Sequence, residues 1–190
     1  MSKQISWHPA KPWFINRAPA HFRPWLSDAG SLTQRLIQAS ANRFRVQVLE
    51  QSWGKASLDE LQVLQLKDAS QAYIRHVHLI CADETWVFAR TVIPRDSLQG
   101  RLSILQHLGS KPLGQLLFSS PGLRRVGREV ACIKPSHPLY NRATQDLSVK
   151  PHELWGRRSL FVLYAKPLLV NEIFLPATAC FKARIRNWSK

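Results

Sequence analysis

Cysteine is scarce in this chain of 190 residues, which holds only Cys81, Cys132 and Cys180. The number is odd, and no two cysteines stand in a C-x-x-C arrangement. A disulfide framework and a zinc site are therefore disfavoured, and a reducing cytosol is the expected compartment. We expect a cytoplasmic protein without a bound metal.

Long hydrophobic runs are lacking as well. The most apolar stretch, residues 160–181, is interrupted by two prolines and by Lys166, Asn171 and Glu172. Such a segment cannot cross a membrane as one helix. The first 20 residues contain three prolines and no continuous apolar segment, so they do not read as a signal peptide.

Acidic residues are few, with 12 Asp and Glu against 27 Lys and Arg, a net charge of +15. This excess attracts anions, whether nucleic acid, anionic lipid or anionic metabolites. The charges are spread along the chain, and among them are Arg124, Arg125, Arg128, Arg157 and Arg158. We expect these arginines to form a solvated face, with nucleic-acid or lipid binding as the alternative.

Several common catalytic motifs do not occur. The sequence has no phosphate loop, dinucleotide fingerprint, nucleophile elbow or metalloprotease motif. His76 and His78 share one face of a predicted strand, which is a metal-like spacing, but no third ligand is apparent. We expect a hydrogen-bonded or solvated histidine pair there.

Alternating apolar and polar residues, together with runs rich in β-branched and aromatic residues, predict about six strands. They cover residues 43–53, 72–81, 86–93, 123–133, 156–165 and 168–175. Helices are predicted from Ser31 and over residues 57–66, 98–108 and 112–118. The chain should therefore form one α+β domain, residues 1–190, in which an antiparallel sheet carries helices that cover the site.

Two segments lie outside these elements. Residues 1–24 are rich in proline and are expected to wrap the surface. Residues 134–153 are polar and contain prolines, which is typical of a long loop or a lid. The last two strands should form an antiparallel pair joined at Lys166-Pro167.

Three charged residues lie on apolar strand faces. Arg75 shares a face with Val77 and Leu79, Arg90 shares one with Trp86 and Phe88, and Glu172 shares one with Leu168 and Val170. A charge in such a place must be paired or must await a partner. Two interpretations stay open at this point: a structural Arg–Glu pair in the core, or a buried pocket for an anionic ligand, because an Arg binds a carboxylate with two parallel hydrogen bonds.

Ordered segments from about Tyr73 to Pro176 resemble the bacterial chorismate pyruvate-lyase family of ubiquinone biosynthesis. They are Cys81-Ala82-Asp83, Ala89-Arg90-Thr91-Val92-Ile93-Pro94, Leu108-Gly109, Lys111-Pro112-Leu113-Gly114, Leu116-Leu117-Phe118, Leu154-Trp155-Gly156-Arg157-Arg158-Ser159, Lys166-Pro167-Leu168-Leu169 and Glu172-Ile173-Phe174-Leu175-Pro176. The order and spacing of these pieces are more specific than any one of them.

The resemblance implies a six-stranded antiparallel sheet and the conversion of chorismate into 4-hydroxybenzoate and pyruvate without a cofactor. It implies that Arg75 binds the ring carboxylate, that the backbone of Leu113 lines the site, and that Glu172 contacts the ring hydroxyl. Leu32 stands where a family member has Met and keeps an apolar role. We further expect Arg90 to face the enolpyruvyl group.

Two other readings remain. The fold resembles ligand-sensing domains of bacterial transcription regulators, but no helix-turn-helix is visible in the sequence. The charge would suit a nucleic-acid-binding protein, but no recognition module is present. We expect chorismate and 4-hydroxybenzoate as partners, no nucleic acid and a monomer; contact with an anionic membrane surface stays an alternative.

Overall fold

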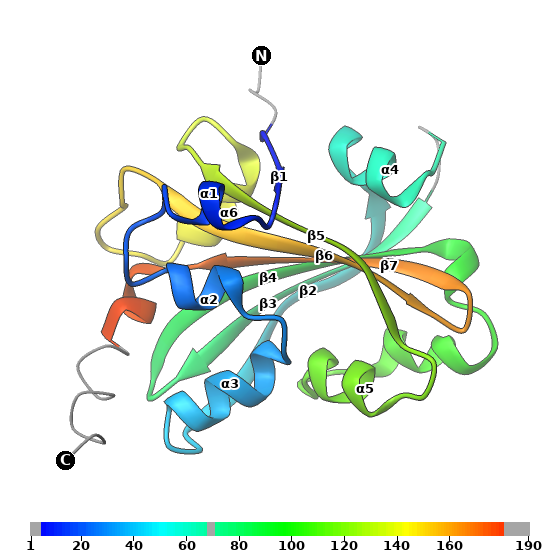
Figure 1. The fold of residues 1–190 in the computed structure, drawn as a ribbon. Helices are drawn as coiled ribbons and strands as arrows, with labels where there is room; N and C mark the ends of the chain where they lie inside the picture. Colours follow the sequence, from blue (N-terminus) through cyan, green and yellow to red (C-terminus); the bar gives the residue numbers. More distant parts are fainter. Residues whose placement is uncertain (1–4, 68–70, 181–190) are drawn as a thin grey trace.

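Seven strands of the described residues form one antiparallel sheet in the order β1-β5-β6-β7-β4-β3-β2 (Figure 1). The computed structural model describes residues 5–67 and 71–180. The strands are β1 His8–Pro9, β2 Phe44–Lys55, β3 Gln71–Cys81, β4 Glu84–Pro94, β5 Arg124–Ile133, β6 Leu154–Leu163 and β7 Lys166–Phe174. The predicted α+β class is confirmed, and the six predicted strands correspond to β2–β7. Strand β1 pairs with β5. With two residues, it is too short to show the alternation of apolar and polar residues by which a strand is predicted.

Six α-helices and three 3₁₀-helices accompany the sheet in the described part of the chain. The α-helices are α1 Pro12–Ile15, α2 Arg23–Ser27, α3 Leu32–Ala39, α4 Leu58–Leu64, α5 Leu113–Ser119 and α6 Pro138–Thr144. The 3₁₀-helices are η1 Arg95–Ser97, η2 Gly100–His107 and η3 Pro176–Cys180. In Figure 1, α3 and α5 lie below the sheet and α4 lies above it.

Local sequence explains where the helices begin and which type they take. Ser31 caps α3 by accepting a hydrogen bond from the backbone of Gln34, and Ser57 forms a reciprocal capping box with Glu60 at α4. The segment predicted as a helix over residues 98–108 is 3₁₀ instead. Its buried leucines recur every third residue, at Leu102, Leu105 and Leu108, and this spacing matches the three residues per turn of a 3₁₀-helix.

Both long hairpins turn through two residues with positive φ. Ala82 and Asp83 join β3 to β4, and Tyr164 and Ala165 join β6 to β7. Two consecutive left-handed residues match the right-handed twist of the flanking strands. The turn predicted at Lys166-Pro167 was thus placed two residues too late, because these two residues already belong to β7.

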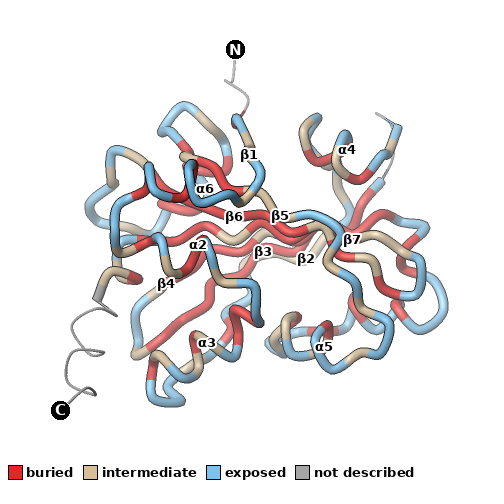
Figure 2. Tube along the Cα trace, in the orientation of Figure 1, coloured by how far each residue is buried: buried red, intermediate tan, exposed pale blue. Residues whose placement is uncertain are grey.

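Apolar side chains fill both faces of the sheet, and Figure 2 shows the buried strands at the centre of the molecule. On one face, a cluster around Trp25, Leu36 and Val87 packs under α1–α3. A second cluster, around Leu105 and Leu117, packs under η2 and α5. The other two apolar clusters of the described chain contain residues from the opposite face of the sheet.

The proline-rich N-terminal segment contributes to the core. Residues 5–27 form β1, α1 and α2. Their side chains include Phe14, Phe22, Trp25 and Leu26, all at most 5 % exposed. The segment therefore covers one end of the sheet and closes the core there.

Residues 134–153, predicted to be a loop or a lid, contain helix α6. Leu139, Tyr140 and Ala143 of this helix pack against Phe88 and Ile173. These three residues are spaced along one helix face, and the interrupting prolines obscured that pattern in the sequence. The helix lies on the face of the sheet opposite to Arg75 and Glu172, so this segment does not cover the pocket that contains those two residues.

Two absences hold for the described residues. No helix there is long and apolar enough to cross a membrane. No group of three or more His, Cys, Asp or Glu side chains there is placed to hold a metal ion.

Three partly or fully buried histidines predict an acid-sensitive fold. Burial lowers the pKa of His76, His78 and His137 from the usual value of 6.5. Below pH 6.5 the histidines of the unfolded chain therefore bind more protons than those of the folded chain. The free energy of unfolding that these histidines contribute above this pH is lost as the pH falls. We expect a lower unfolding temperature at about pH 5.5 than at about pH 7.5, where carboxylates hardly titrate.

Thermal melting monitored by circular dichroism measures this difference. His78→Gln should reduce it, because His78 is 4 % exposed and its Nε2 has no hydrogen-bond partner in the described chain. Equal melting temperatures at the two pH values would contradict the prediction.

Candidate functional site

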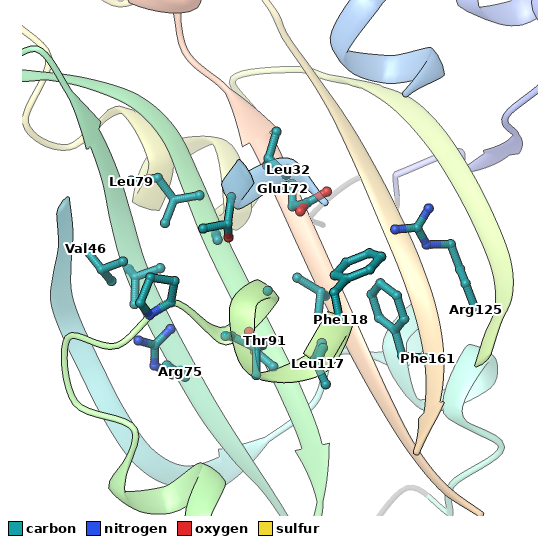
Figure 3. A pocket seen from close by; sticks show the side chains of 17 residues that line it. Leu32, Val46, Arg75, Leu79, Thr91, Leu117, Phe118, Arg125, Phe161 and Glu172 are labelled. Atoms are coloured by element: carbon teal, nitrogen blue, oxygen red, sulfur yellow. The ribbon is translucent and has the colours of Figure 1, made fainter. Parts of the chain in front are cut away.

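A pocket lies between the two apolar clusters on the face of the sheet that carries α3 and α5 (Figure 3). Its floor consists of alternate residues from three adjacent strands, and its walls come from the two helices and from β5 and β6. The floor residues are Arg75, Val77 and Leu79 of β3, Ala89 and Thr91 of β4, and Val170 and Glu172 of β7. The wall residues include Leu32, Thr33, Leu113, Gly114, Phe118, Arg125 and Phe161.

The strand register brings Arg75 and Glu172 to this pocket. Arg75 pairs with Thr91 across β3 and β4, and Ala89 pairs with Glu172 across β4 and β7. Residues 89 and 91 point to the same face, so the two charged side chains share it. Their Cα atoms are about 12 Å apart, judged from the strand spacing and the rise per residue.

Arg75 is 3 % exposed and has only neutral partners. Its Nε donates to Oε1 of Gln51 at 3.0 Å, and one Nη donates to the carbonyls of Gly109 at 2.8 Å and Lys111 at 3.3 Å. It makes no ion pair within the described chain. Burial lowers the pKa of the guanidinium to about 10, so Arg75 remains charged at neutral pH. A buried charge without a countercharge at the floor of a pocket suits an anionic ligand.

Glu172 has a cationic partner inside the protein. Nε of Arg157 donates to its Oε2 at 2.5 Å, and the Arg157 side chain is 2 % exposed. The sequence left two interpretations open, a structural Arg–Glu pair and a pocket for an anionic ligand. The structure contains both features, each at a different residue. Glu172 belongs to a structural Arg–Glu pair, and Arg75 is an unpaired cation in a pocket that also includes Glu172.

Three arginines of β5 and β6 hold the loop that precedes α3. Arg157 donates to the carbonyls of Trp25 and Asp28, Arg128 donates to the carbonyl of Asp28, and Arg125 donates to the carbonyls of Ala29 and Gly30. These acceptors belong to the end of α2 and the loop after it, where helix carbonyls lack intrahelical partners. The expectation of a solvated arginine face is wrong for Arg157, which is 1 % exposed, and for Arg158, which is 5 % exposed.

Leu32 and Leu113 come from the first turns of α3 and α5 and close the pocket. The two helices meet at Gly114. A Cβ atom at this position would lie 2.6 Å from Oγ1 of Thr33, which is closer than side chains approach. Glycine therefore permits the contact between the helices over the pocket.

The pocket is partly enclosed. Its internal volume is about 50 Å³, enough for a few water molecules.

Arg90 does not reach this pocket, which corrects the expectation that it faces the ligand together with Arg75. Because Thr91 is the residue opposite Arg75, Arg90 is opposite His76 and points to the other face. There it forms a two-pronged ion pair with Glu60 at 2.8 and 2.9 Å. Alternation along one strand shows which of its residues point to the same face of the sheet. Only the register between two strands shows which of their residues share a face.

The other face carries its own network of polar side chains. Nη1 of Arg90 lies 2.8 Å from Nε2 of His76. Since Arg is only a donor, Nε2 accepts and the Nδ1–H of His76 donates to Glu50 at 3.1 Å. Asn171 donates to Glu60 at 3.0 Å. The predicted hydrogen-bonded role therefore holds for His76.

The sequence reasoning missed two residues of the site, Arg125 and Arg157. Both were grouped with the exposed Arg124 because arginines usually lie at the surface. The one available signal was the strand that contains Arg157, in which Trp155, Phe161 and Leu163 are apolar. Arg125 carried no such signal, since its contacts come from residues 29–30 and from Phe118 and Phe161.

Comparison with solved structures defines the fold. The effector domain of PhnF from Mycobacterium smegmatis has a similar fold, with a TM-score of 0.57 and 13% identity over 78% of this chain and 90% of that domain. A GntR-family transcriptional regulator from Bacillus cereus gives a TM-score of 0.53 at 13% identity, over 72% of this chain and 94% of that one.

Sequence comparison gives the family. A family profile described as chorismate lyase matches residues 1–185. Proteins named probable chorismate pyruvate-lyase are 40% identical in Nitrosomonas eutropha, over 91% of this chain and 94% of the relative, and 39% identical in Nitrosospira multiformis, over 90% and 93%. The chain belongs to the chorismate lyase family of enzymes, and the resemblance found in its sequence is confirmed.

The contact at Gly114 generates a prediction. Gly114→Ala should push α5 away from α3, destabilise the protein by about 1–3 kcal/mol through overpacking, and weaken binding of a ligand held between the helices. Chemical denaturation and ligand titration measure the two effects. Thr33→Ala removes the opposing hydroxyl, so the double variant should recover part of both losses. Independent, additive losses in the double variant would show that the two residues do not oppose each other.

Proposed function

We propose that this protein converts chorismate into 4-hydroxybenzoate and pyruvate by elimination without a cofactor, as the first committed step of ubiquinone biosynthesis. The observation that carries the proposal is the pocket of a chorismate lyase family member in which Arg75 has no countercharge and Glu172 lies on the same sheet face. An aromatic acid with a hydroxyl at the far end of its ring presents two matching groups.

The substrate supplies the driving force. Chorismate carries a ring carboxylate, a ring hydroxyl and, on the neighbouring ring carbon, an enolpyruvyl ether. When the ether C–O bond breaks and the carbon that bears the hydroxyl loses its hydrogen, the electrons of that C–H bond complete an aromatic ring. The enolpyruvyl group leaves and its methylene takes up a proton, which yields pyruvate. The protein has to bind the dianion and hold it in the conformation that eliminates.

Arg75 is the proposed anchor for the ring carboxylate. Its guanidinium keeps contacts to Gln51 and to two carbonyls, which fix its position before the ligand arrives. Pre-positioned donors lose little freedom when they bind, and the surrounding apolar walls strengthen the attraction. Leu32 and the backbone at Leu113 would enclose the ring.

Glu172 is proposed to hold the ring hydroxyl and thereby orient the ring. Arg157 occupies Oε2 of this carboxylate, which leaves Oε1 for the hydroxyl. A carboxylate held this way is positioned to accept a hydrogen bond. The ring hydrogen can pass directly to the enolpyruvyl methylene within the substrate, so this role of Glu172 requires no proton transfer by the protein.

The activity itself is the first test. Purified protein incubated with chorismate should release pyruvate and 4-hydroxybenzoate in equal amounts, and a metal chelator should not change the rate. Coupled reduction of pyruvate and chromatography of the aromatic product measure both. A protein that binds chorismate and returns it unchanged would contradict the proposal and would favour a ligand-sensing role.

The role of Glu172 predicts the behaviour of Glu172→Gln. The amide keeps a hydrogen-bonding oxygen, so kcat should fall by less than about tenfold, whereas loss of a catalytic proton transfer would cost roughly 10²–10⁴-fold. The unfolding temperature should fall as well, because Arg157 loses its countercharge.

Glu129→Gln is the matched control, since it removes a carboxylate bonded to Arg158 at 2.6 Å on the other face. It should lower stability with little effect on kcat. A loss beyond about a hundredfold in folded Glu172→Gln would instead assign proton transfer to Glu172.

A further inference from the structure

We propose that Arg125 binds the second carboxylate of the substrate, the one on the enolpyruvyl group. This inference rests on the proposed function, because it concerns the same pocket and a dianionic substrate. Arg75 serves one carboxylate, and Arg90 is committed to Glu60 on the other face of the sheet. A second cation must therefore come from elsewhere in the pocket wall.

Arg125 lines the pocket from β5. Its guanidinium carbon lies 5.0 Å from the ring centre of Phe161 and 5.5 Å from that of Phe118. Figure 3 shows Arg125 and Arg75 at opposite sides of the pocket, with Phe118 and Phe161 beside Arg125. The two rings pack against the guanidinium and limit its motion, and each favours the cation through its π-electrons.

The hydrogen bonds of Arg125 leave its charge uncompensated. Its two Nη atoms donate to the carbonyls of Ala29 at 2.6 Å and Gly30 at 3.2 Å, which are neutral acceptors. Its Nε is buried and has no partner among the described residues. No carboxylate of the described chain forms an ion pair with it. Arg125 thus resembles Arg75 in having a partly satisfied, unpaired guanidinium at the pocket.

The surroundings of Arg125 have a surplus of positive charge. Burial and the nearby cation Arg157 lower the pKa of Arg125, and Arg128 acts in the same direction, while Glu172 and Asp28 oppose them. Asp28 also forms an ion pair with Arg35 at 3.3 Å, so arginines outnumber carboxylates around Arg125. A further negative charge would reduce this surplus.

The chemistry of the substrate places the second carboxylate at this end. The enolpyruvyl ether stands on the ring carbon next to the one that bears the hydroxyl. If Glu172 holds the hydroxyl, the ether lies beside Glu172. Arg75 and Arg125 each lie two strands from Glu172, on opposite sides of it. The charge of Glu172 acts on Arg125, whereas Tyr73 is the one side chain of the described residues whose charge acts on Arg75. The two unpaired arginines thus equal the two carboxylates of the substrate in number and oppose them in charge.

The test compares two stable ligands that share the ring of the product. 3-Carboxymethoxy-4-hydroxybenzoate carries an ether-linked second carboxylate beside the hydroxyl, and 3-methoxy-4-hydroxybenzoate carries a neutral methyl ether there. Calorimetry gives their affinities for the wild-type protein, Arg125→Met, Arg125→Lys and Arg75→Met. Arg124→Met is the matched control, because Arg124 is the exposed neighbour outside the pocket.

Arg125→Met should weaken binding of the dicarboxylate by about tenfold or more and leave the methyl ether within about threefold. Arg125→Lys should recover part of the loss, Arg75→Met should weaken both ligands, and Arg124→Met should weaken neither. With chorismate, Arg125→Met should raise KM more than it lowers kcat.

Equal weakening of both ligands in Arg125→Met would overturn the proposal and reduce Arg125 to a support for residues 29–30. Unchanged binding of the dicarboxylate would overturn it as well. If the wild-type protein prefers the dicarboxylate but does not turn over chorismate, the proposed function fails, while the comparison of ligands still decides the role of Arg125.

Discussion

The ion pair between Arg157 and Glu172 connects the parts of this fold that make the pocket. Arg157 stands on β6 directly opposite Glu172 on β7, and it also binds two carbonyls of the segment between α2 and α3. One buried side chain thereby holds a sheet residue of the pocket and the chain that enters the covering helix. Removal of either partner would leave a buried charge unpaired, a loss that is usually large.

The charged and polar residues of the sheet lie together in a band across its middle strands. On the pocket face the band includes Arg75 and Glu172, between two apolar clusters. On the other face it includes His76, Arg90 and Asn171 at the adjacent register positions. The network on that second face supplies carboxylate partners, so its charges are compensated by the fold itself. On the pocket face, two arginines contact only neutral oxygens.

The features that could be predicted from the sequence are those that depend on the local alternation of apolar and polar residues. Six strands followed from alternation and β-branched composition, and Arg75 and Glu172 were found because a charge on an apolar strand face is conspicuous. The position of Arg90 depended on register, which a bulge at Trp86 helps to set, and no single strand reveals it. The arginine contacts to residues 25–30 join positions 95 to 132 residues apart, so their partners could be identified only in the folded chain.

The same distribution of charge links stability to binding. Two guanidinium groups without an ion-pair partner, the buried Arg75 and the half-buried Arg125, lie at one pocket, and burial of such a charge is costly while no anion is present. A dianion would balance both and would stabilise the folded state by mass action. Because aromatisation drives the proposed reaction, the protein need not supply a strong acid or base. Its fold instead holds two positive groups without ion-pair partners at one pocket, and a cost in stability of this kind is a common trade between stability and function.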